Sequence, residues 1–474
     1  MARAGFVGPA YALDTIDAAC QRSVNWYLVG MDEQNEPTKV MLRGTPGLKN
    51  WVTVSANEPV RGCIVAGTKL LVVCGAKVYT VTTAGVVSSS LATLSSSQGT
   101  ISMATNGQQV LMVDGVSAYI YSISGGTVTT ITDPDFPYGA DMCAFMDGYF
   151  IVNDPGTQNY YISSSYDGTA WNALDFGAAE GQPDNLVTLA CLNGQLWLFG
   201  ESTSEVHYDS GAADFPFTKV PGALVQRGCL AKHSVAVGNG TVYWFGSDRC
   251  VYRSAGYQAQ KVSTTAMGQH FAKFTTVSDA YGIVYQQEGH EFYVLTFPTE
   301  GETWVYDAGT GRWHERGEWS ADIDDFLQWR GSCVAVFNDS VVVGDYSNGK
   351  LYTLDVDTVT DNGTNIVRLR RTPHFSNTML RVFHNSVTVV IQTGVNEESL
   401  PTDEPQAMLR WSNDGGHSWS NELWRSLGRQ GAYSRRVQWN RLGMSRNRVY
   451  ELRITDAIRP AVMDDNLEVA GAVS

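Results

Sequence analysis

Hydrophobic and polar positions alternate along most of the chain, and the alternating stretches recur in seven segments of one design. Each segment holds an apolar strand, a turn rich in Gly, Asn and Asp, a second apolar strand and then an aromatic strand. Period-two alternation bounded by turn residues is typical of β-strands. Successive segments start 41, 40, 46, 46, 48 and 48 residues apart, at Val60, Ile101, Asp141, Val187, His233, Tyr281 and Trp329. The pattern predicts an all-β protein.

The length of the repeat indicates the architecture. A unit of about 40–50 residues with about four strands is typical of a β-propeller blade. The dipeptides "NG" at 106, 193 and 239 and "DG" at 147 suit two-residue hairpin turns. We therefore predict a β-propeller of six or seven blades over residues 56–362. A stacked pair of β-sandwiches is the alternative, and the regular spacing favours it less.

The two flanks of the repeat differ from it. Residues 1–55 are expected to contribute to propeller closure or to an interface, with "TKVMLRGTPGL" as the candidate closing strand. Residues 363–474 contain further strands such as "RVYELRITD" among Arg-rich loops, which predicts a smaller C-terminal β-domain. The final stretch "DDNLEVAGAVS" is expected to be a loose tail.

Charge separates the same regions. Residues 366–474 hold 14 Arg, no Lys and 11 acidic residues, which gives a net charge of +3. Residues 1–365 carry a net charge of −18, so the whole chain has −15. An acidic body is a poor electrostatic partner for DNA phosphates. Arginine without lysine favours planar contacts to carboxylates and aromatic rings, which are common at protein interfaces. A merely solvated acidic surface explains the body equally well.

The cysteines and the N-terminus bear on the compartment. None of the eight cysteines forms a CxxC pair, and most lie in apolar stretches, where Cys behaves as a small hydrophobic residue. The N-terminus has no apolar signal core, and no window of the chain approaches a membrane span. We expect assembly in a reducing cytoplasm.

One short motif raises the question of catalysis. "RWSNDGGHSWSN" resembles the Asp-box, a turn motif known from sialidase propellers. Its Asp carboxylate is expected to accept turn amides, its Gly to take a positive φ, and its Trp to pack under the hairpin. A shorter relative covers residues 165–171. The residues of this structural turn are Ser412, Asp414, Gly416, Ser418 and Trp419.

The rest of a glycosidase is missing from the pattern. Sialidase chemistry needs an arginine triad around a carboxylate and a tyrosine activated by an acid, yet residues 55–365 are poor in arginine. No HxH or HExxH spacing supports a metal site, and no GxSxG or phosphate-binding loop occurs. We predict no catalytic, cofactor-binding or metal-binding residues and no enzymatic activity.

The strongest interaction candidate is the Arg-rich stretch near the C-terminus. Aromatic residues interleaved with arginine suit an interface hot spot. Nucleic-acid binding is the rival interpretation, disfavoured by neighbouring acids and by the acidic body. The candidate interface residues are Arg425, Arg429, Tyr433, Arg435, Arg436, Trp439, Arg441 and Arg446.

Several stretches together resemble one family. "AACQRSVNWYLV" with "VMLRGTPGL", and the C-terminal segment from "LRWSNDGG" to "YELRITD", are similar to tail-hub proteins of short-tailed phages, also called packaged-DNA stabilisation proteins or tail nozzles. The resemblance covers nearly the whole chain.

The resemblance implies a structural virion protein assembled in the host cytoplasm. It implies a hexameric ring below the portal–adaptor complex that extends the DNA channel, retains packaged double-stranded DNA without sequence-specific binding, and holds tailspikes or fibres and a needle or plug. The alternatives are a carbohydrate-binding or sialidase-like propeller and a cytoplasmic scaffold propeller. The missing catalytic constellation argues against glycan cleavage, and a scaffold leaves the terminal resemblances unexplained.

Overall fold

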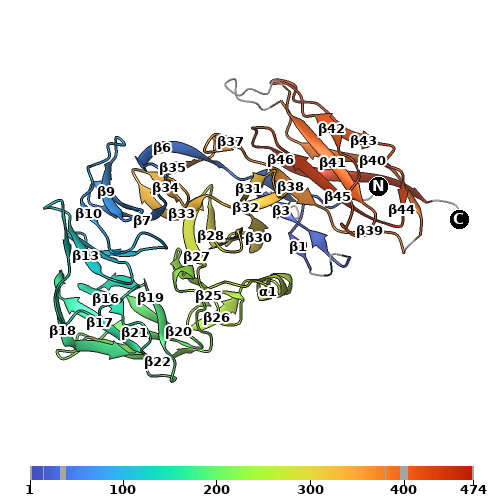
Figure 1. Cartoon of the computed structure of the whole chain (residues 1–474). Helices are drawn as coiled ribbons and strands as arrows, with labels where there is room; N and C mark the ends of the chain where they lie inside the picture. The colour runs from blue at the N-terminus through green and yellow to red at the C-terminus, as the bar shows by residue number, and fades with distance from the viewer. Residues whose placement is uncertain are drawn as a thin grey trace.

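The computed structural model describes residues 3–13, 15, 17–31, 39–378, 380–394 and 404–471. Almost all of its regular structure is β-strand, and the predicted fold class is confirmed. A ring of blades occupies one end of the molecule and a β-sandwich the other (Figure 1). None of the described helices has the length and apolar character that a membrane crossing requires.

Six blades consist of four consecutive antiparallel strands each. In chain order they are β7–β10 (Val60–Ala66, Lys69–Cys74, Lys77–Thr82, Ala92–Thr93), β11–β14 (Ser102–Thr105, Gln109–Val113, Ala118–Ser122, Thr127–Thr130), β15–β18 (Cys143–Met146, Tyr149–Asn153, Asn159–Ser164, Asp167–Ala178), β19–β22 (Leu186–Leu192, Gln195–Gly200, Ser204–Asp209, Phe217–Val225), β23–β26 (Ala236–Val237, Val242–Phe245, Val251–Ala255, Gln258–Lys261) and β27–β30 (Tyr281–Gln287, His290–Phe297, Glu302–Asp307, Arg312–Glu315).

The seventh blade is assembled from both ends of the propeller sequence. Its first strands are β33 (Gly331–Phe337), β34 (Ser340–Asp345) and β35 (Gly349–Asp355), and β6 (Gly47–Ser55) pairs antiparallel with β35. The inner strand β33 contacts β7 of the first blade, which closes the ring. The structure thus has seven blades, and residues 47–55 close them.

The strand predicted to close the propeller, residues 38–48, lies mostly before the strand that does so, residues 47–55. Most of residues 38–48 form β5 (Lys39–Gly44), which pairs with β4 (Trp26–Met31) and with the C-terminal strand β46 (Ala461–Gly471). Both β5 and β6 are hydrophobic alternating strands, so the pattern alone did not distinguish them. The intervening turn sends β5 to the sandwich and β6 to the propeller.

Seven hydrophobic clusters hold the ring, one between each pair of neighbouring blades. In β8, Leu70 and Val72 pack toward the seventh blade, whereas Leu71 and Val73 pack toward the second. A sheet buried on both faces has continuous apolar strands, because neither side of the strand meets water. This explains the unbroken runs such as "KLLVVC" in the repeat.

Of the four predicted Asn–Gly and Asp–Gly turns, those at 147 and 193 are tight two-residue connections, whereas those at 106 and 239 lie in longer connections, so the prediction was wrong for these two. Asp147 and Gly148 have φ of 49° and 96°, and Asn193 and Gly194 have φ of 51° and 69°. Two successive positive φ angles define a type I′ turn, which matches the twist of the hairpin. These dipeptides therefore fix the register of the first hairpin in the third and fourth blades.

The sandwich has two sheets around one core of aliphatic and aromatic side chains, including Trp26 and Trp439. One sheet is formed by β38 (Arg368–Arg371), β39 (Phe375–Ser376), β41 (Gln406–Ser412), β42 (Leu423–Ser426) and β45 (Asn447–Ile454). The other is formed by β4, β5, β40 (Val382–Ile391), β43 (Val437–Asn440), β44 (Met444–Ser445) and β46.

The predicted loose tail is instead a structural strand as far as residue 471. β46 pairs with β40 along its length, and Leu467 is fully buried. The buried Asp465 carboxylate accepts the backbone amides of Ala4, Gly5, Phe6 and Val7. The two ends of the chain are thus tied together, and residues 472–474 lie outside the described residues.

The propeller and the sandwich share a continuous sheet. Strand β3 (Ser23–Val24) pairs with β30 of the sixth blade on one side and with β38 of the sandwich on the other. The buried Arg316 guanidinium lies 4.1 Å from the centre of the Trp329 ring and donates to the Pro46 carbonyl at 2.7 Å. Arg459 of the sandwich pairs with Glu288 of the propeller. These contacts join the two domains through both backbone and side chains.

The remaining elements are short connections around this frame: β1 (Tyr11–Ala12), β2 (Cys20–Gln21), the 3-10 turn η1 (Lys232–Ser234), α1 (Thr265–Ala272), β31 (Gly317–Ser320), β32 (Asp325–Gln328), β36 (Thr360–Asp361) and β37 (Thr364–Asn365).

Candidate functional site

The Asp-box lies in the hairpin between β41 and β42 of the sandwich, not in a propeller blade. The Ser418 amide donates to an Asp414 oxygen at 2.9 Å, and the Ser412 hydroxyl donates to the same oxygen at 2.6 Å. The Gly416 amide donates to Ser412 Oγ at 2.8 Å, with Gly416 at a φ of 108°. Hydrogen bonds from Ser412 and Ser418 hold the pKa of the Asp414 carboxyl far below its usual value. Asp414 is thus engaged in shaping the turn.

Trp419 covers a charged cluster rather than a binding cleft. The guanidinium carbons of Arg371 and Arg410 lie 4.9 and 5.0 Å from its ring centre. Both arginines pair with the fully buried Glu451, at 2.7 and 2.6 Å. Burial acts to raise the pKa of Glu451, but the two arginines outweigh it and lower the pKa. The cluster therefore holds the sheet together as a set of matched charges.

The shorter relative of the motif is likewise a local turn, in the third blade. Asp167 accepts the Thr169 amide at 3.0 Å, and the Trp171 indole donates to the Gly168 carbonyl at 2.9 Å. The Trp171 ring packs edge-on against Phe136, with ring centres 4.9 Å apart. Its side chain belongs to the core between the second and third blades.

The propeller arginines in the core serve the backbone. Arg61 is buried and donates to the carbonyls of Gly75, Ser96, Gln98 and Gly99. Arg316 is committed to the joint. Across the described parts of the chain, no three His, Cys, Asp or Glu side chains are grouped as metal ligands.

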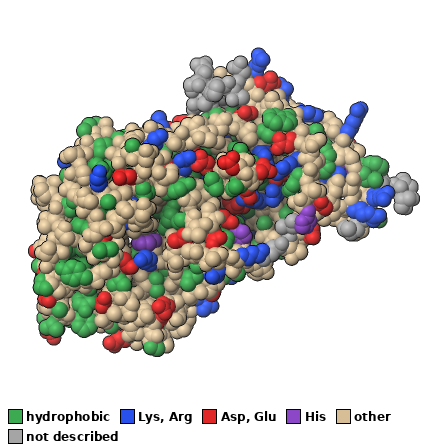
Figure 2. Space-filling model, in the orientation of Figure 1, with side chains coloured by type: hydrophobic (Ala, Val, Ile, Leu, Met, Phe, Trp, Pro, Cys, Tyr) green, Lys and Arg blue, Asp and Glu red, His purple; other side chains and the backbone are tan. Residues whose placement is uncertain are grey.

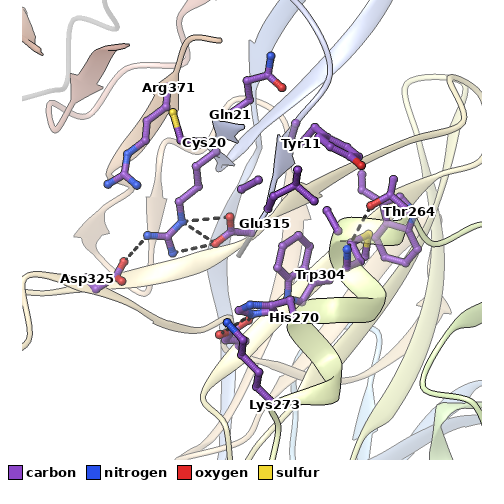
Figure 3. A pocket seen from close by; sticks show the side chains of 18 residues that line it. Tyr11, Cys20, Gln21, Thr264, His270, Lys273, Trp304, Glu315, Asp325 and Arg371 are labelled. Atoms are coloured by element: carbon purple, nitrogen blue, oxygen red, sulfur yellow. Dashed lines mark hydrogen bonds and ion pairs between the residues drawn. The ribbon is translucent and has the colours of Figure 1, made fainter. Parts of the chain in front are cut away.

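A pocket of about 340 Å³ lies where the N-terminal hairpin β1–β2, helix α1 and the sixth blade meet. Arg22 spans Glu315 and Asp325 at 2.8 and 2.7 Å, and His270 contacts Glu302 at 2.8 Å (Figure 3). Figure 3 places Arg371 and Lys273 at opposite ends of the pocket. Since these carboxylates already neutralise cations of the fold, the pocket fits a structural role beside the joint.

The Arg-rich stretch forms the outer edge of the sandwich. Arg425 lies in β42, and Arg429, Tyr433, Arg435 and Arg436 lie in the connection from β42 to β43. All five are exposed, and Tyr433 retains 71% of its accessible surface. Figure 2 shows basic side chains projecting from this end of the molecule. We call the exposed residues between 424 and 446 the arginine edge.

Some of these arginines also make polar contacts within the described part of the fold. Arg435 pairs with Glu404 at 3.0 Å, and Arg425 donates to the Gln438 carbonyl at 2.8 Å. Arg441 and Arg446 are also exposed, in the loops that follow β43 and β44. The edge therefore offers several guanidinium groups and an aromatic ring to a partner.

Trp439 does not belong to this surface. It is fully buried in the sandwich core, and its indole donates to the Leu423 carbonyl at 2.7 Å. Its assignment to the interface was wrong, because β43 alternates and turns Trp439 inward while Gln438 and Asn440 lie on the other side. Conversely, Trp424 is 52% exposed and belongs to this surface, although the sequence analysis did not name it. The only feature of the sequence that pointed to Trp424 was its position directly before Arg425.

Comparison with known proteins decides the family. Two family models match, described as bacteriophage P22 Gp10, beta-propeller, over residues 15–359, and bacteriophage P22 Gp10, beta-sandwich, over residues 367–470. The chain belongs to the bacteriophage P22 Gp10 family. The family resemblance found in the sequence is confirmed, and the Gp10 family is one of phage stabilisation proteins of the tail nozzle, a structural class of virion protein.

Two solved structures are distantly similar to the chain. The computationally designed Ika8 protein matches with 12% identity and a TM-score of 0.37, covering 65% of this chain and 99% of its own. PorZ of the type-IX secretion system of Porphyromonas gingivalis matches with 12% identity and a TM-score of 0.38, covering 78% of this chain and 46% of its own. Such low scores say nothing about the function of this Gp10 relative. No curated protein matches the chain.

Proposed function

We propose that this Gp10-family protein forms a homo-oligomeric ring, a hexamer, below the portal–adaptor complex of a short-tailed phage. The ring extends the DNA channel, retains packaged DNA, and anchors tailspikes or fibres and a needle or plug. The observation that carries the proposal beyond the family is the arginine edge, a row of exposed guanidinium groups on a domain joined to the propeller by strand β3.

The arginine edge is the docking element in this proposal. Guanidinium groups make bidentate contacts to carboxylates, and exposed Arg, Tyr and Trp are enriched at interface hot spots. An acidic propeller of a second copy, or an acidic face of the adaptor, is the matching surface, since residues 1–365 carry a net charge of −18. Opposite charges also speed association and orient the partners.

The acidic body is proposed to keep the DNA moving. A channel wall of negative charge repels phosphates, so DNA passes without being held. Free duplex DNA should therefore not bind to the channel wall of the assembled ring at about 0.1 M salt. Tight, salt-sensitive DNA binding by the ring would contradict this part of the proposal.

The docking proposal is tested by sedimentation of the full chain with a purified portal–adaptor assembly. The wild type should co-sediment, and the reversal R429E/R436E should abolish co-sedimentation while the monomer stays folded by circular dichroism. The matched control K69E/K77E reverses two exposed charges on the first blade and should leave binding intact. Unchanged binding by R429E/R436E, or no binding by the wild type, would overturn the proposal.

A further inference from the structure

Two free cysteines face each other where the propeller ring closes. Cys63 lies in β7, the inner strand of the first blade, and Cys333 lies in β33, the inner strand of the last. Both belong to the hydrophobic cluster between these two blades, and both line a cavity of about 470 Å³ at the inner strands. They come from opposite ends of the propeller sequence, about 270 residues apart.

The two cysteines lie across the contact between β7 and β33, and each thiol affects the other. The neighbouring Cys63 lowers the pKa of the Cys333 thiol, whereas Cys333 raises the pKa of the Cys63 thiol. The thiolate is the form that attacks a disulfide. Close by, the Ser332 hydroxyl donates to the Val60 carbonyl at 2.6 Å, so the two strands are also held together beside the thiols.

We propose that Cys63 and Cys333 are a site of disulfide formation that cross-links the first and last blades. The oxidant is a low-molecular-weight disulfide, RSSR. The Cys333 thiolate attacks one sulfur of RSSR, which forms a mixed disulfide and releases RS⁻. Cys63 then loses its proton and attacks the Cys333 sulfur, which forms the Cys63–Cys333 bond and releases the second RS⁻. Two protein thiols are oxidised by two electrons, and RSSR is reduced to two RSH.

The consequence lies in ring closure. Apart from β6, the first and last blades are held to each other by packing and side-chain contacts. A cross-link over so long a loop strongly reduces the conformational freedom of the unfolded chain. The setting rests on the family's place in the virion, because particles assembled in a reducing cytoplasm later meet oxidising surroundings. The chemistry itself does not depend on docking or on the arginine edge.

The test treats the purified full chain with oxidised glutathione and maps disulfide-linked peptides by mass spectrometry without reduction. We expect the loss of two of the eight thiols, a Cys63–Cys333 peptide, and a rise in Tm of about 5 °C that dithiothreitol reverses. No thiol loss, stable glutathione adducts, or a disulfide between other cysteines would overturn the proposal.

Variants separate this pair from cysteine content in general. C63S should remove both the linked peptide and the rise in Tm. The control C143S/C191S alters two cysteines on the neighbouring inner strands β15 and β19, where the Cys143 thiol contacts Ser102 and the Leu111 carbonyl instead. That control should keep the cross-link. Should C63S fail to fold, the wild-type peptide map alone decides the matter.

Discussion

The propeller and the sandwich reach a folded state by different means. In the propeller, six blades are made of consecutive strands, and six of the seven hydrophobic clusters join a blade to the next one along the chain, while the seventh cluster joins the last blade to the first. In the sandwich, strands from residues 26–44 lie in one sheet with strands from residues 382–471. Local repeats leave a regular trace in the sequence, whereas a sheet assembled from both chain ends does not.

Charge is used differently as well. The sandwich buries Arg368, Arg370 and Arg448 completely and places Glu451 among three arginines. The propeller also buries charged side chains, among them Arg61, Asp307 and Asp345, but they lie in separate blades. Since a buried charge is stable only with its partners, the sandwich should be especially sensitive to the loss of the one carboxylate that its arginines share. The propeller should be most sensitive at its single point of closure.

Breaking the closing strand should have the largest effect. Lys49 is exposed in β6, which lies between β35 and β36, so Lys49→Pro removes little packing but disrupts a strand with two neighbours. We expect a loss of at least about 3 kcal/mol in the free energy of unfolding, measured by denaturant titration. Thr129→Pro in β14, an outer strand with one neighbour, should cost clearly less. Equal losses would mean that closure does not control propeller stability.

The sandwich counterpart is the buried carboxylate. Glu451→Ala leaves Arg371, Arg410 and Arg453 without their common partner and should cost about 3–5 kcal/mol in the free energy of unfolding. Glu422→Ala removes only a partly exposed partner of Arg453, 3.6 Å away, and should cost less than about 1 kcal/mol. Chemical denaturation of both variants makes the comparison, and similar losses would refute the role given to Glu451.

Acid should weaken the sandwich through His384. Burial, followed by the charge of Arg448, lowers the pKa of His384 to about 4 from an ordinary value of 6.5. As the pH falls, His384 therefore takes up a proton in the unfolded chain before it does so in the folded one. Its contribution to the free energy of unfolding is complete above pH 6.5 and is lost as the pH falls toward 4. This histidine accounts for up to about 3 kcal/mol of that loss.

His384→Gln tests this assignment, because glutamine offers hydrogen bonds to Ser445 and Tyr450 but does not titrate. The variant should show a shallower pH dependence of unfolding between pH 6.5 and 4. A slope identical to that of the wild type would show that His384 is not the group responsible. His233 and His314 of the propeller, whose pKa values burial also lowers, should contribute to the dependence that remains.

The smallest effect belongs to the turn motif. Ser412 is buried, donates to Asp414 and accepts the Gly416 amide, so Ser412→Ala should cost about 1 kcal/mol by thermal unfolding. Binding to the portal–adaptor assembly should be unchanged, because the turn lies outside the arginine edge. Loss of binding by this variant, with its fold intact, would move the docking surface to the hairpin.

The sequence revealed the propeller more completely than the sandwich for a physical reason. Blades bury both faces of consecutive strands, so their starts, turns and apolar runs appear in order along the chain. The sequence predicted a loose tail in place of β46 because its partner strands, β5 and β40, lie far away in the sequence. In addition, Asp465 is a polar residue that is buried, since its carboxylate accepts four backbone amides near the N-terminus.

The same limit applies to the candidate surface. A count of arginines drew attention to the segment but did not show that Arg448, at its end, is buried and donates to the Leu442 carbonyl inside the sandwich. Nor did it separate exposed Tyr433 from buried Trp439. These differences depend on which side of a strand or loop faces the opposite sheet, and that requires the three-dimensional pairing.

The most direct test of the account is cryo-electron microscopy of the full chain bound to the portal–adaptor assembly. The account predicts a ring of six copies around an open channel, capping the adaptor, with residues 425–446 of each copy in a contact between proteins. A chain that remains monomeric beside the assembly, or a ring whose arginine edge faces solvent in every copy, would contradict it.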